Sequence, residues 1–359
     1  TVKDVGTVTV RAERTVPNYG TATDEWTFTV EPKAVTAEVK IDPKDYDGST
    51  AIADTAIHAA VKNGDLVNPG DASAVSGLTA VYDTPNAGRN KTVTLDSSGA
   101  SSAADPRKYA VSYPAATVGD INPKQVTVTV ELSGEGLQTD SSANPPNYYI
   151  FDGTAKTPNV TLKDENGNTI PEEAYTVAYS NNTNVSDENS GVYAVVTVTA
   201  KPDGNYAFTS NPATARFEIR KEQAKVIAAP KPAGDPLFYN TREQQLVTAG
   251  TGSGGTMVYS LDENGTYTAD IPTKKDAGTY TVYYKVQGDG NYEGNDTIRS
   301  VSVTIRPKEI ISPVITVSDT YDYTFNGTAK EPPVTVEDGG TVIDGPGTAK
   351  PEYTAQYSN

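Results

Sequence analysis

The chain has 359 residues, of which 36% are hydrophobic and 21% are charged, and its formal net charge is −17. A surface this acidic repels phosphate backbones and anionic lipid headgroups, which excludes nucleic acid as a partner and argues against membrane insertion. The sequence contains no cysteine, so disulfides, thiolate metal sites and thiol nucleophiles are excluded as well.

The predicted elements are short strands with alternating apolar residues, at 8–10, 26–30, 126–130, 215–219 and 301–305. Their β-branched residues and their period of two favour strands. Gly and Pro, with 30 and 24 residues, interrupt the chain too often for long helices. Residues 50–61 fit a short helix and a strand equally well. We therefore predict an all-β fold.

An internal repeat divides the chain. Four strands end in similar junctions, which are Val30-Glu31-Pro32-Lys33, Ile121-Asn122-Pro123-Lys124, Ile219-Arg220-Lys221-Glu222 and Ile305-Arg306-Pro307-Lys308. Their first residues, at 30, 121, 219 and 305, lie 91, 98 and 86 residues apart. This period is the size of an immunoglobulin-like sandwich, about 100 residues.

Two turn motifs recur with the junctions. An aromatic residue and an Asp or Asn follow each junction, at Tyr46-Asp47-Gly48, Phe151-Asp152-Gly153, Tyr239-Asn240 and Phe325-Asn326-Gly327. An Asn-Tyr pair precedes three junctions, at Asn18-Tyr19, Asn205-Tyr206 and Asn291-Tyr292, and Lys108-Tyr109 takes its place before the remaining one. Asp-Gly and Asn-Gly steps supply the positive φ that tight turns need.

These motifs resemble known repeats. Tyr46-Asp47-Gly48, together with residues 86–93, resembles the YDG-type module of large bacterial surface adhesins, filamentous-haemagglutinin-like proteins among them. Residues 151–158, with 179–182 and Asn205-Tyr206, are similar to the bacterial Ig-like and MBG-type repeats of the same class of proteins. The resemblance covers nearly the whole chain. It implies an extracellular location on the bacterial cell surface and no catalytic residues.

The repeat predicts tandem Ig-like β-sandwich modules in an elongated rod, because junctions that contain proline limit bending. We expect a YDG-like module at 34–122, an Ig-like module at 123–220 and an Ig-like or MBG-like module at 221–306. Residues 1–33 contain only the C-terminal half of a module, and residues 307–359 only the N-terminal half. Periodicity does not distinguish a sandwich from a β-grasp topology.

The two half modules complement each other, because the predicted last strand at 353–359 matches residues 175–181 of a complete module. A half sandwich exposes an apolar face and unpaired strand edges. We expect either that the C-terminal half of one copy pairs with the N-terminal half of the next, or that the chain is one period of a longer covalent repeat. Both arrangements make a fibre. The other interpretation is a fragment whose ends match by chance. The residues expected to carry self-assembly are Val8, Val10, Tyr19, Phe28, Phe325, Tyr353 and Tyr357.

Two acidic segments resemble calcium loops, with Asp164, Asn166, Asp262 and Asn264 as candidate ligands. Neither segment continues to the glutamate that an EF-type loop requires at its twelfth position. An Asn-Gly step between strands is also an ordinary hairpin turn. The sequence therefore predicts no cofactor, with Ca²⁺ as the alternative.

Catalytic patterns are missing from the sequence. His58 is the single histidine, and no Gly-x-Ser-x-Gly segment is present, so we expect no catalytic triad and no enzyme. The junction lysines Lys33, Lys124 and Lys308 are expected to be solvated, and the alternative is a covalent cross-link to an Asn of the last strand.

The sequence thus predicts a structural repeat region of a bacterial extracellular surface protein, which forms a stalk or a head-to-tail fibre with copies of itself. One alternative is an adhesin module that binds host or cell-wall glycans through exposed tyrosines. The other is an accessory segment of a larger surface enzyme.

Overall fold

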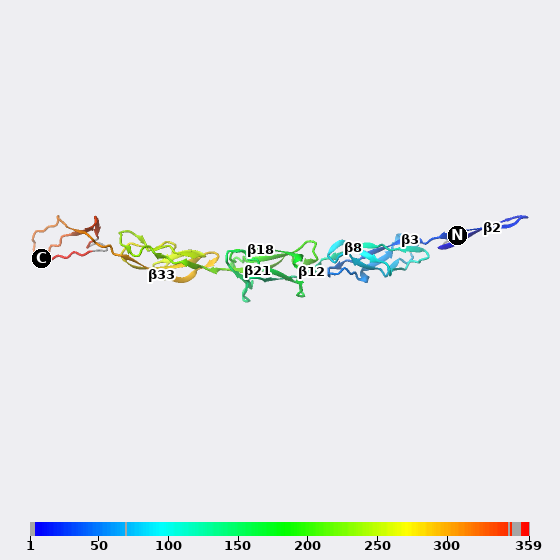
Figure 1. Ribbon diagram of the computed structural model, residues 1–359, viewed down its shortest axis with the longest axis horizontal. Coiled ribbons are helices and arrows are strands. Elements are labelled where there is room, and N and C mark those ends of the chain that lie inside the picture. The colour runs from blue at the N-terminus through cyan, green and yellow to red at the C-terminus, as the bar shows by residue number, and fades with distance from the viewer. Residues whose placement is uncertain (1–3, 69, 344, 347–352, 359) are drawn as a thin grey trace. The chain divides into compact units, whose positions relative to one another are not determined.

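The computed structural model describes residues 4–68, 70–343, 345–346 and 353–358. The chain divides into two compact units, Thr1–Arg220 and Lys221–Asn359, and each is described by itself (Figure 1). Strands dominate both units, and the described residues include three short 3₁₀ helices and no α-helix. No helix among them is both long and apolar enough to cross a bilayer.

The first unit begins with a two-stranded antiparallel hairpin, which we call the N-terminal hairpin. Its strands are β1 (Gly6–Val16) and β2 (Gly20–Val30), paired from Gly6–Val30 to Val16–Gly20. Within the described residues no further strand joins this sheet. The hairpin is drawn in blue in Figure 1.

The first module follows at residues 33–122. Its elements are β3 (Lys33–Ile41), β4 (Lys44–Asp45), η1 (Asp54–Ala56), β5 (Ile57–Val61), η2 (Asn63–Asp65), β6 (Ala74–Ser76), β7 (Thr79–Tyr82), β8 (Gly88–Asp96), β9 (Ser101–Ser102), β10 (Tyr109–Ser112) and β11 (Ala116–Asn122). They form one sheet in the order β10-β3-β5-β6-β9 and a second in the order β4-β11-β8-β7. A core between the sheets joins Val39 of the first to Tyr82, Val93 and Ile121 of the second.

The second module occupies residues 124–220. Its elements are β12 (Lys124–Val126), β13 (Thr129–Ser133), β14 (Gln138–Thr139), β15 (Asn147–Ile150), β16 (Asn159–Lys163), β17 (Thr169–Ile170), η3 (Glu172–Ala174), β18 (Tyr175–Ser180), β19 (Ala194–Ala200), β20 (Tyr206–Phe208) and β21 (Ala213–Arg220). The main sheets run β14-β15-β21-β19-β18 and β13-β16-β17. Phe217, Ile219 and Val196 of the larger sheet and Leu162 of the smaller one are fully buried.

The third module opens the second unit at residues 222–306. Its strands are β22 (Glu222–Gln223), β23 (Lys225–Ala228), β24 (Lys231–Pro232), β25 (Leu237–Phe238), β26 (Gln244–Gln245), β27 (Val247–Thr248), β28 (Thr251–Ser253), β29 (Gly255–Ser260), β30 (Thr273–Lys274), β31 (Gly278–Gly288), β32 (Tyr292–Glu293) and β33 (Asn295–Arg306). The sheet β25-β33-β31-β29 is accompanied by four strand pairs. Its core gathers around Leu246, Val282, Val286 and Ile305.

The C-terminal segment, residues 308–358, is the smallest sheet-forming part of the second unit. It contains β34 (Pro313–Val317), β35 (Val334–Asp338) and β36 (Thr341–Ile343), in that order within one antiparallel sheet. The order and pairing correspond to β13-β16-β17 of the second module: Ile315 lies opposite Val336, as Val130 lies opposite Leu162. The segment therefore repeats one sheet of a complete module.

Two predicted strands differ from the structure, and the open alternative between helix and strand at residues 50–61 is resolved. Residues 50–61 contain the short 3₁₀ helix η1 followed by strand β5. The predicted strand 126–130 is broken between β12 and β13, because its two parts pair with different sheets. The predicted last strand at 353–359 was wrong for residues 353–358, which have no regular structure, since no neighbouring strand is there to pair with them. Asn359 lies outside the described residues.

Candidate functional site

Each complete module closes with the same parallel contact between its front and its back. A short strand pairs in parallel with the end of the last strand, with the pairs Lys44–Ile121, Tyr149–Ile219 and Leu237–Ile305. The aromatic residue of the turn motif then donates its backbone N–H to the next carbonyl, from Tyr46 to Asn122, Phe151 to Arg220 and Tyr239 to Arg306, at 2.9 Å in every case. The turn motif is thus tied to the last strand of its own module.

The Asp or Asn of the turn motif caps the turn with its side chain. Its Oδ1 accepts the backbone N–H two residues later, with distances of 2.9 Å for Asp47–Ser49, 2.8 Å for Asp152–Thr154, 3.0 Å for Asn240–Arg242 and 3.1 Å for Asn326–Thr328. These Asx turns need only local residues. The fourth turn therefore forms in the C-terminal segment although none of the described strands pairs in parallel beside it.

Burial of the turn aromatic separates the C-terminal segment from the complete modules. Phe151 is 7% exposed, and Tyr46 and Tyr239 are half-buried. Phe325 is 90% exposed. An apolar ring of this size is normally among the most buried parts of a domain. The C-terminal segment thus leaves its turn aromatic uncovered, unlike the complete modules.

The N-terminal hairpin carries the other apolar surface. Tyr19 is 88% exposed, Trp26 66% and Val10 49%, whereas Val8 and Phe28 are half-buried. The Trp26 and Phe28 rings contact each other, with centroids 5.2 Å apart. Two strands alone cannot enclose a core, so this apolar surface has no cover within the hairpin.

Two tyrosines fasten residues 353–358 to the C-terminal sheet. The Tyr357 hydroxyl donates to the Pro332 carbonyl at 2.6 Å, and the Tyr353 hydroxyl donates to the Val334 carbonyl. The second module contains the same pair of contacts, because Tyr179 donates to Pro158 and Tyr175 donates to Val160. Residues 353–358 thus hold the position of β18 without being a strand. The predicted self-assembly residues are therefore gathered in two groups, one in the hairpin and one in the C-terminal segment.

A lysine–aspartate pair, which sequence reasoning missed, joins the junction to the end of a central strand. Lys308 Nζ lies 3.2 Å from Asp338 Oδ2, and Lys124 Nζ lies 3.8 Å from Asp164 Oδ2. The ammonium of Lys308, ahead of a backbone N–H donated by Ser312, holds the pKa of Asp338 below its ordinary value. The sequence feature that could have revealed this pair is the Val-Thr-x-x-Asp segment, which occurs at 160–164 and again at 334–338.

The calcium candidates lie in two separate turns. Asp164 Oδ1 accepts the N–H groups of Asn166 and Asn168, both at 2.9 Å, within the β16–β17 turn. These bonds, that of Asn168 first, lower the pKa of Asp164. Asp262 caps the turn after β29 in the same way, accepting from the Asn264 N–H at 3.0 Å. Across the residues described, no group of three or more acidic or histidine side chains could hold a metal ion. Both aspartates thus cap turns.

The remaining candidate groups lie at the surface of the first module. His58 Nε2 lies 2.7 Å from Asp42 Oδ2, and both side chains are more than half exposed. Lys33 Nζ donates to the Asp65 carbonyl at 2.5 Å. Neither contact contains a nucleophile held by a base, which is the arrangement that covalent catalysis uses.

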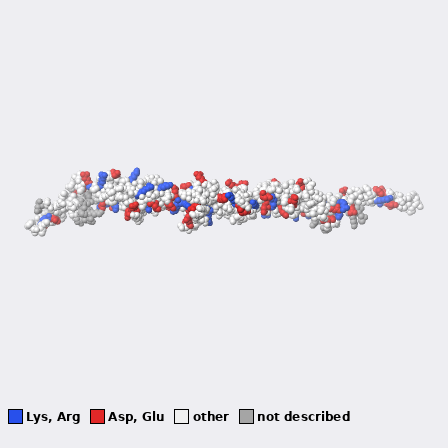
Figure 2. Space-filling model, turned by 90° about the horizontal axis from the view of Figure 1, so that it is seen from below, with Lys and Arg blue, Asp and Glu red and all other residues white. Residues whose placement is uncertain are grey.

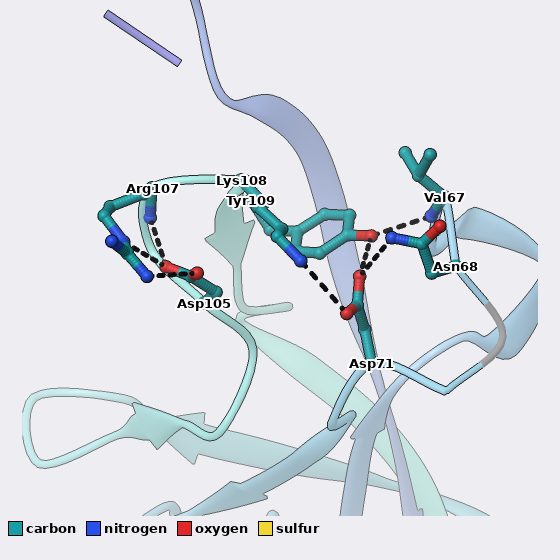
Figure 3. Close-up of polar contacts among 7 residues, drawn as sticks. All are labelled: Val67, Asn68, Asp71, Asp105, Arg107, Lys108 and Tyr109. Carbon is teal, nitrogen blue, oxygen red and sulfur yellow. Dashed lines mark hydrogen bonds and ion pairs between the residues drawn. The ribbon is translucent and has the colours of Figure 1, made fainter. Parts of the chain in front are cut away.

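A polar cluster in the first module fastens the loop that follows η2 (Figure 3). The Tyr109 side chain is buried, and its hydroxyl donates to Asp71 Oδ2 at 2.6 Å and accepts the Val67 N–H at 2.8 Å. The hydroxyl of Tyr109, ahead of the ammonium of Lys108, lowers the pKa of Asp71. Tyr109 also pairs with Lys33 at the start of the module, so the cluster supports the junction.

We expect Tyr109→Phe to destabilise the first module by about 1–2 kcal/mol, because the hydroxyl loses both partners. The change also returns the pKa of Asp71 toward its ordinary value. A carboxyl with a lowered pKa stabilises the fold above its unfolded-state pKa, and that contribution disappears as the pH falls through its folded-state pKa. Urea unfolding should therefore show a smaller difference between variant and wild type at pH 3 than at pH 7.

Tyr267→Phe is the matched control, because the Tyr267 hydroxyl donates to the Glu263 carbonyl on an exposed turn. Its effect should stay within about 0.5 kcal/mol. Equal effects of the two substitutions, or a difference independent of pH, would contradict the assignment of Asp71 to this cluster.

Acidic and basic side chains alternate along the surface. On the face shown in Figure 2, red and blue side chains are interspersed among uncharged ones. Several oppositely charged side chains of the described residues form ion pairs, for example Lys91 with Asp83 at 3.2 Å and Lys163 with Glu131 at 2.8 Å. Charge of both signs is therefore dispersed over this face.

Comparison with known proteins identifies one part of the chain. Residues 31–117 match the YDG domain, so the first module is a YDG-type module. This match covers the segment in which Tyr46-Asp47-Gly48 occurs. No curated protein matches the chain.

Proposed function

We propose that this chain is a structural repeat region of a bacterial extracellular surface protein. Its tandem modules, which we take to be Ig-like β-sandwiches, form a stalk or a head-to-tail fibre by strand complementation. The repeat of closing contacts in three modules supports this proposal, as does the YDG match at 31–117. The protein works as a scaffold without catalysis, cofactor or insertion into a membrane.

A single observation carries the proposal: two apolar surfaces are exposed, and each corresponds to one half of a module core. Tyr19 and Phe325 are 88% and 90% exposed, although the corresponding aromatic residues of complete modules are buried or half-buried. Large exposed apolar surfaces mark interaction sites. Burying a large apolar side chain contributes about 1.5–3 kcal/mol, so covering several of them would stabilise a contact between copies.

Self-association tests the proposal. Sedimentation velocity over a wide range of concentration should show wild-type chains growing into longer species. Phe325→Glu should abolish this growth, because it places a charge where a core must form. Ile227→Glu is the control, since Ile227 is 67% exposed on β23 of the third module and lies outside both surfaces.

Two results would overturn the proposal. One is a wild-type chain that stays monomeric at every concentration, and the other is equal loss of association in the Phe325 and Ile227 variants. Circular dichroism of each variant shows whether its modules remain folded.

A further inference from the structure

Each complete module also opens with a parallel contact in a fixed register. The first strand begins beside the tyrosine that follows Asn or Lys, with the pairs Lys33–Tyr109, Lys124–Tyr206 and Glu222–Tyr292. The backbone N–H of Lys33 donates to the Lys108 carbonyl and that of Lys124 to the Asn205 carbonyl, both at 2.9 Å. Together with the closing contact, this gives two parallel registers that join the front of a module to its back.

The two incomplete parts supply one side of each register. In the C-terminal segment, Lys308 corresponds to the opening residues Lys33 and Lys124, and Tyr323 corresponds to the closing residue Tyr149. The N-terminal hairpin has the back residues, Tyr19 and Val30. Val30 pairs with Gly6 within the hairpin. Lys308, Tyr323 and Tyr19 pair with no strand among the described residues.

The hairpin already has the strand register of a complete back half. Gly6 lies opposite Val30, just as Gly278 lies opposite Ile305 in the third module. Val8 lies opposite Phe28, as Ala194 lies opposite Phe217 in the second. Phe28 and Phe217 both stand two residues before the junction, and Phe217 is fully buried. The hairpin is therefore preformed in the geometry that a module core requires.

We infer that the C-terminal segment of one copy and the N-terminal hairpin of a second copy form one module with these defined registers. Lys308 pairs in parallel with Tyr19, and Tyr323 pairs in parallel with Val30. The Phe325 N–H then donates to the Glu31 carbonyl, and its ring is covered by β2. This inference rests on the proposed function and specifies the contact.

A third pairing follows from β18 of the second module. Tyr179 lies opposite Val196, and Tyr175 lies opposite Ala200, in the antiparallel β18–β19 pair. Tyr357 and Tyr353 hold the positions of these tyrosines, because they make the same hydroxyl contacts with the strand beside them. Val10 holds the position of Val196. Residues 353–358 therefore become a strand antiparallel to β1 of the second copy, with Tyr357 opposite Val10.

Disulfide trapping tests the registers directly, because the chain contains no cysteine of its own. The first pair is Thr324→Cys in one copy with Glu31→Cys in another, at positions that match Ile150 and Arg220. The second pair is Gln356→Cys with Arg11→Cys, at positions that match Ala178 and Thr197. The Cα atoms of facing residues in neighbouring strands lie about 4.5–5.5 Å apart, within the Cα separation that a disulfide spans. Mixed oxidation with one copy carrying a size tag should give the cross-linked heterodimer for both pairs.

Thr27→Cys and Thr7→Cys are the matched controls for Glu31→Cys and Arg11→Cys. Each lies four residues along the same strand face, about 13 Å from the intended partner. Cross-linking should be lost with either control. Chains that associate in sedimentation yet cross-link equally well at the control positions would overturn the registers and leave the proposed function standing.

A chain that carries both Thr324→Cys and Glu31→Cys shows whether the C-terminal segment binds its own hairpin or the hairpin of a second copy. Oxidation at low concentration should leave it uncross-linked, and oxidation at high concentration should give dimers and longer ladders. A cross-linked monomer would show that the segment binds its own hairpin, which would overturn the assignment to a second copy. The absence of any association would instead refute the proposed function.

Discussion

Phe217→Ala should destabilise the second module by about 3–5 kcal/mol, whereas Phe28→Ala should leave the stability of the isolated chain almost unchanged. Phe217 is fully buried in β21 and contacts the Tyr149 ring, with centroids 5.6 Å apart. Removing a ring from such a site loses its transfer free energy and leaves a cavity. Phe28 holds the same position in β2, but only one neighbouring strand covers it. Urea unfolding of both variants measures the contrast.

In self-association the two variants should rank in the opposite order, with the larger loss in Phe28→Ala. Phe28→Ala should weaken the growth seen in sedimentation, because the ring becomes part of a core only when a second copy covers the hairpin. Phe217→Ala, examined where the second module is still folded, should associate like wild type. If Phe28→Ala destabilised the monomer as strongly as Phe217→Ala, the hairpin would already contain a core, contrary to the structure.

Gly77→Ala should destabilise the first module by roughly 3 kcal/mol. Gly77 lies between β6 and β7 with φ of +73°, and a Cβ there would collide with the backbone carbonyl oxygen of Gly99. The substitution therefore combines a left-handed conformation with a clash that only a shift of the backbone relieves. The midpoint of urea unfolding of this module measures the effect.

Gly153→Ala separates the two causes. Gly153 has a similar φ of +82°, and a Cβ at this position has no atom within 4 Å. Gly153→Ala should lower the free energy of unfolding only by the cost of the left-handed conformation, about 1–2 kcal/mol. Equal effects at the two glycines would show that the close approach of Gly99 contributes nothing.

Local residues explain the features that sequence analysis predicted correctly. The all-β class follows from alternation and from frequent Gly and Pro, and both act over a few neighbouring residues. The turns at Asp47, Asp152, Asn240 and Asn326 form as expected, since an Asx turn needs only the two residues that follow.

Contacts between distant residues explain what sequence analysis missed. Period two shows that alternate side chains share a face, but it does not show which strand lies beside which. The break at 126–130, the parallel pairs such as Tyr149–Ile219 and the bond from Tyr109 to Asp71 each depend on a partner elsewhere in the chain. Residues 353–358 do not form the predicted strand for the same reason, because a strand needs a neighbouring strand to pair with.

By itself, the sequence determined the strand class and the turns at the recurring aromatic–Asp/Asn motifs, because these depend on neighbouring residues. Only the tertiary structure decided the parallel registers that open and close each module, and the burial of Phe217 against the exposure of Phe325. These depend on which backbones meet, and residues 76 and 82 positions apart, Lys33 with Tyr109 and Lys124 with Tyr206, are brought together only by folding.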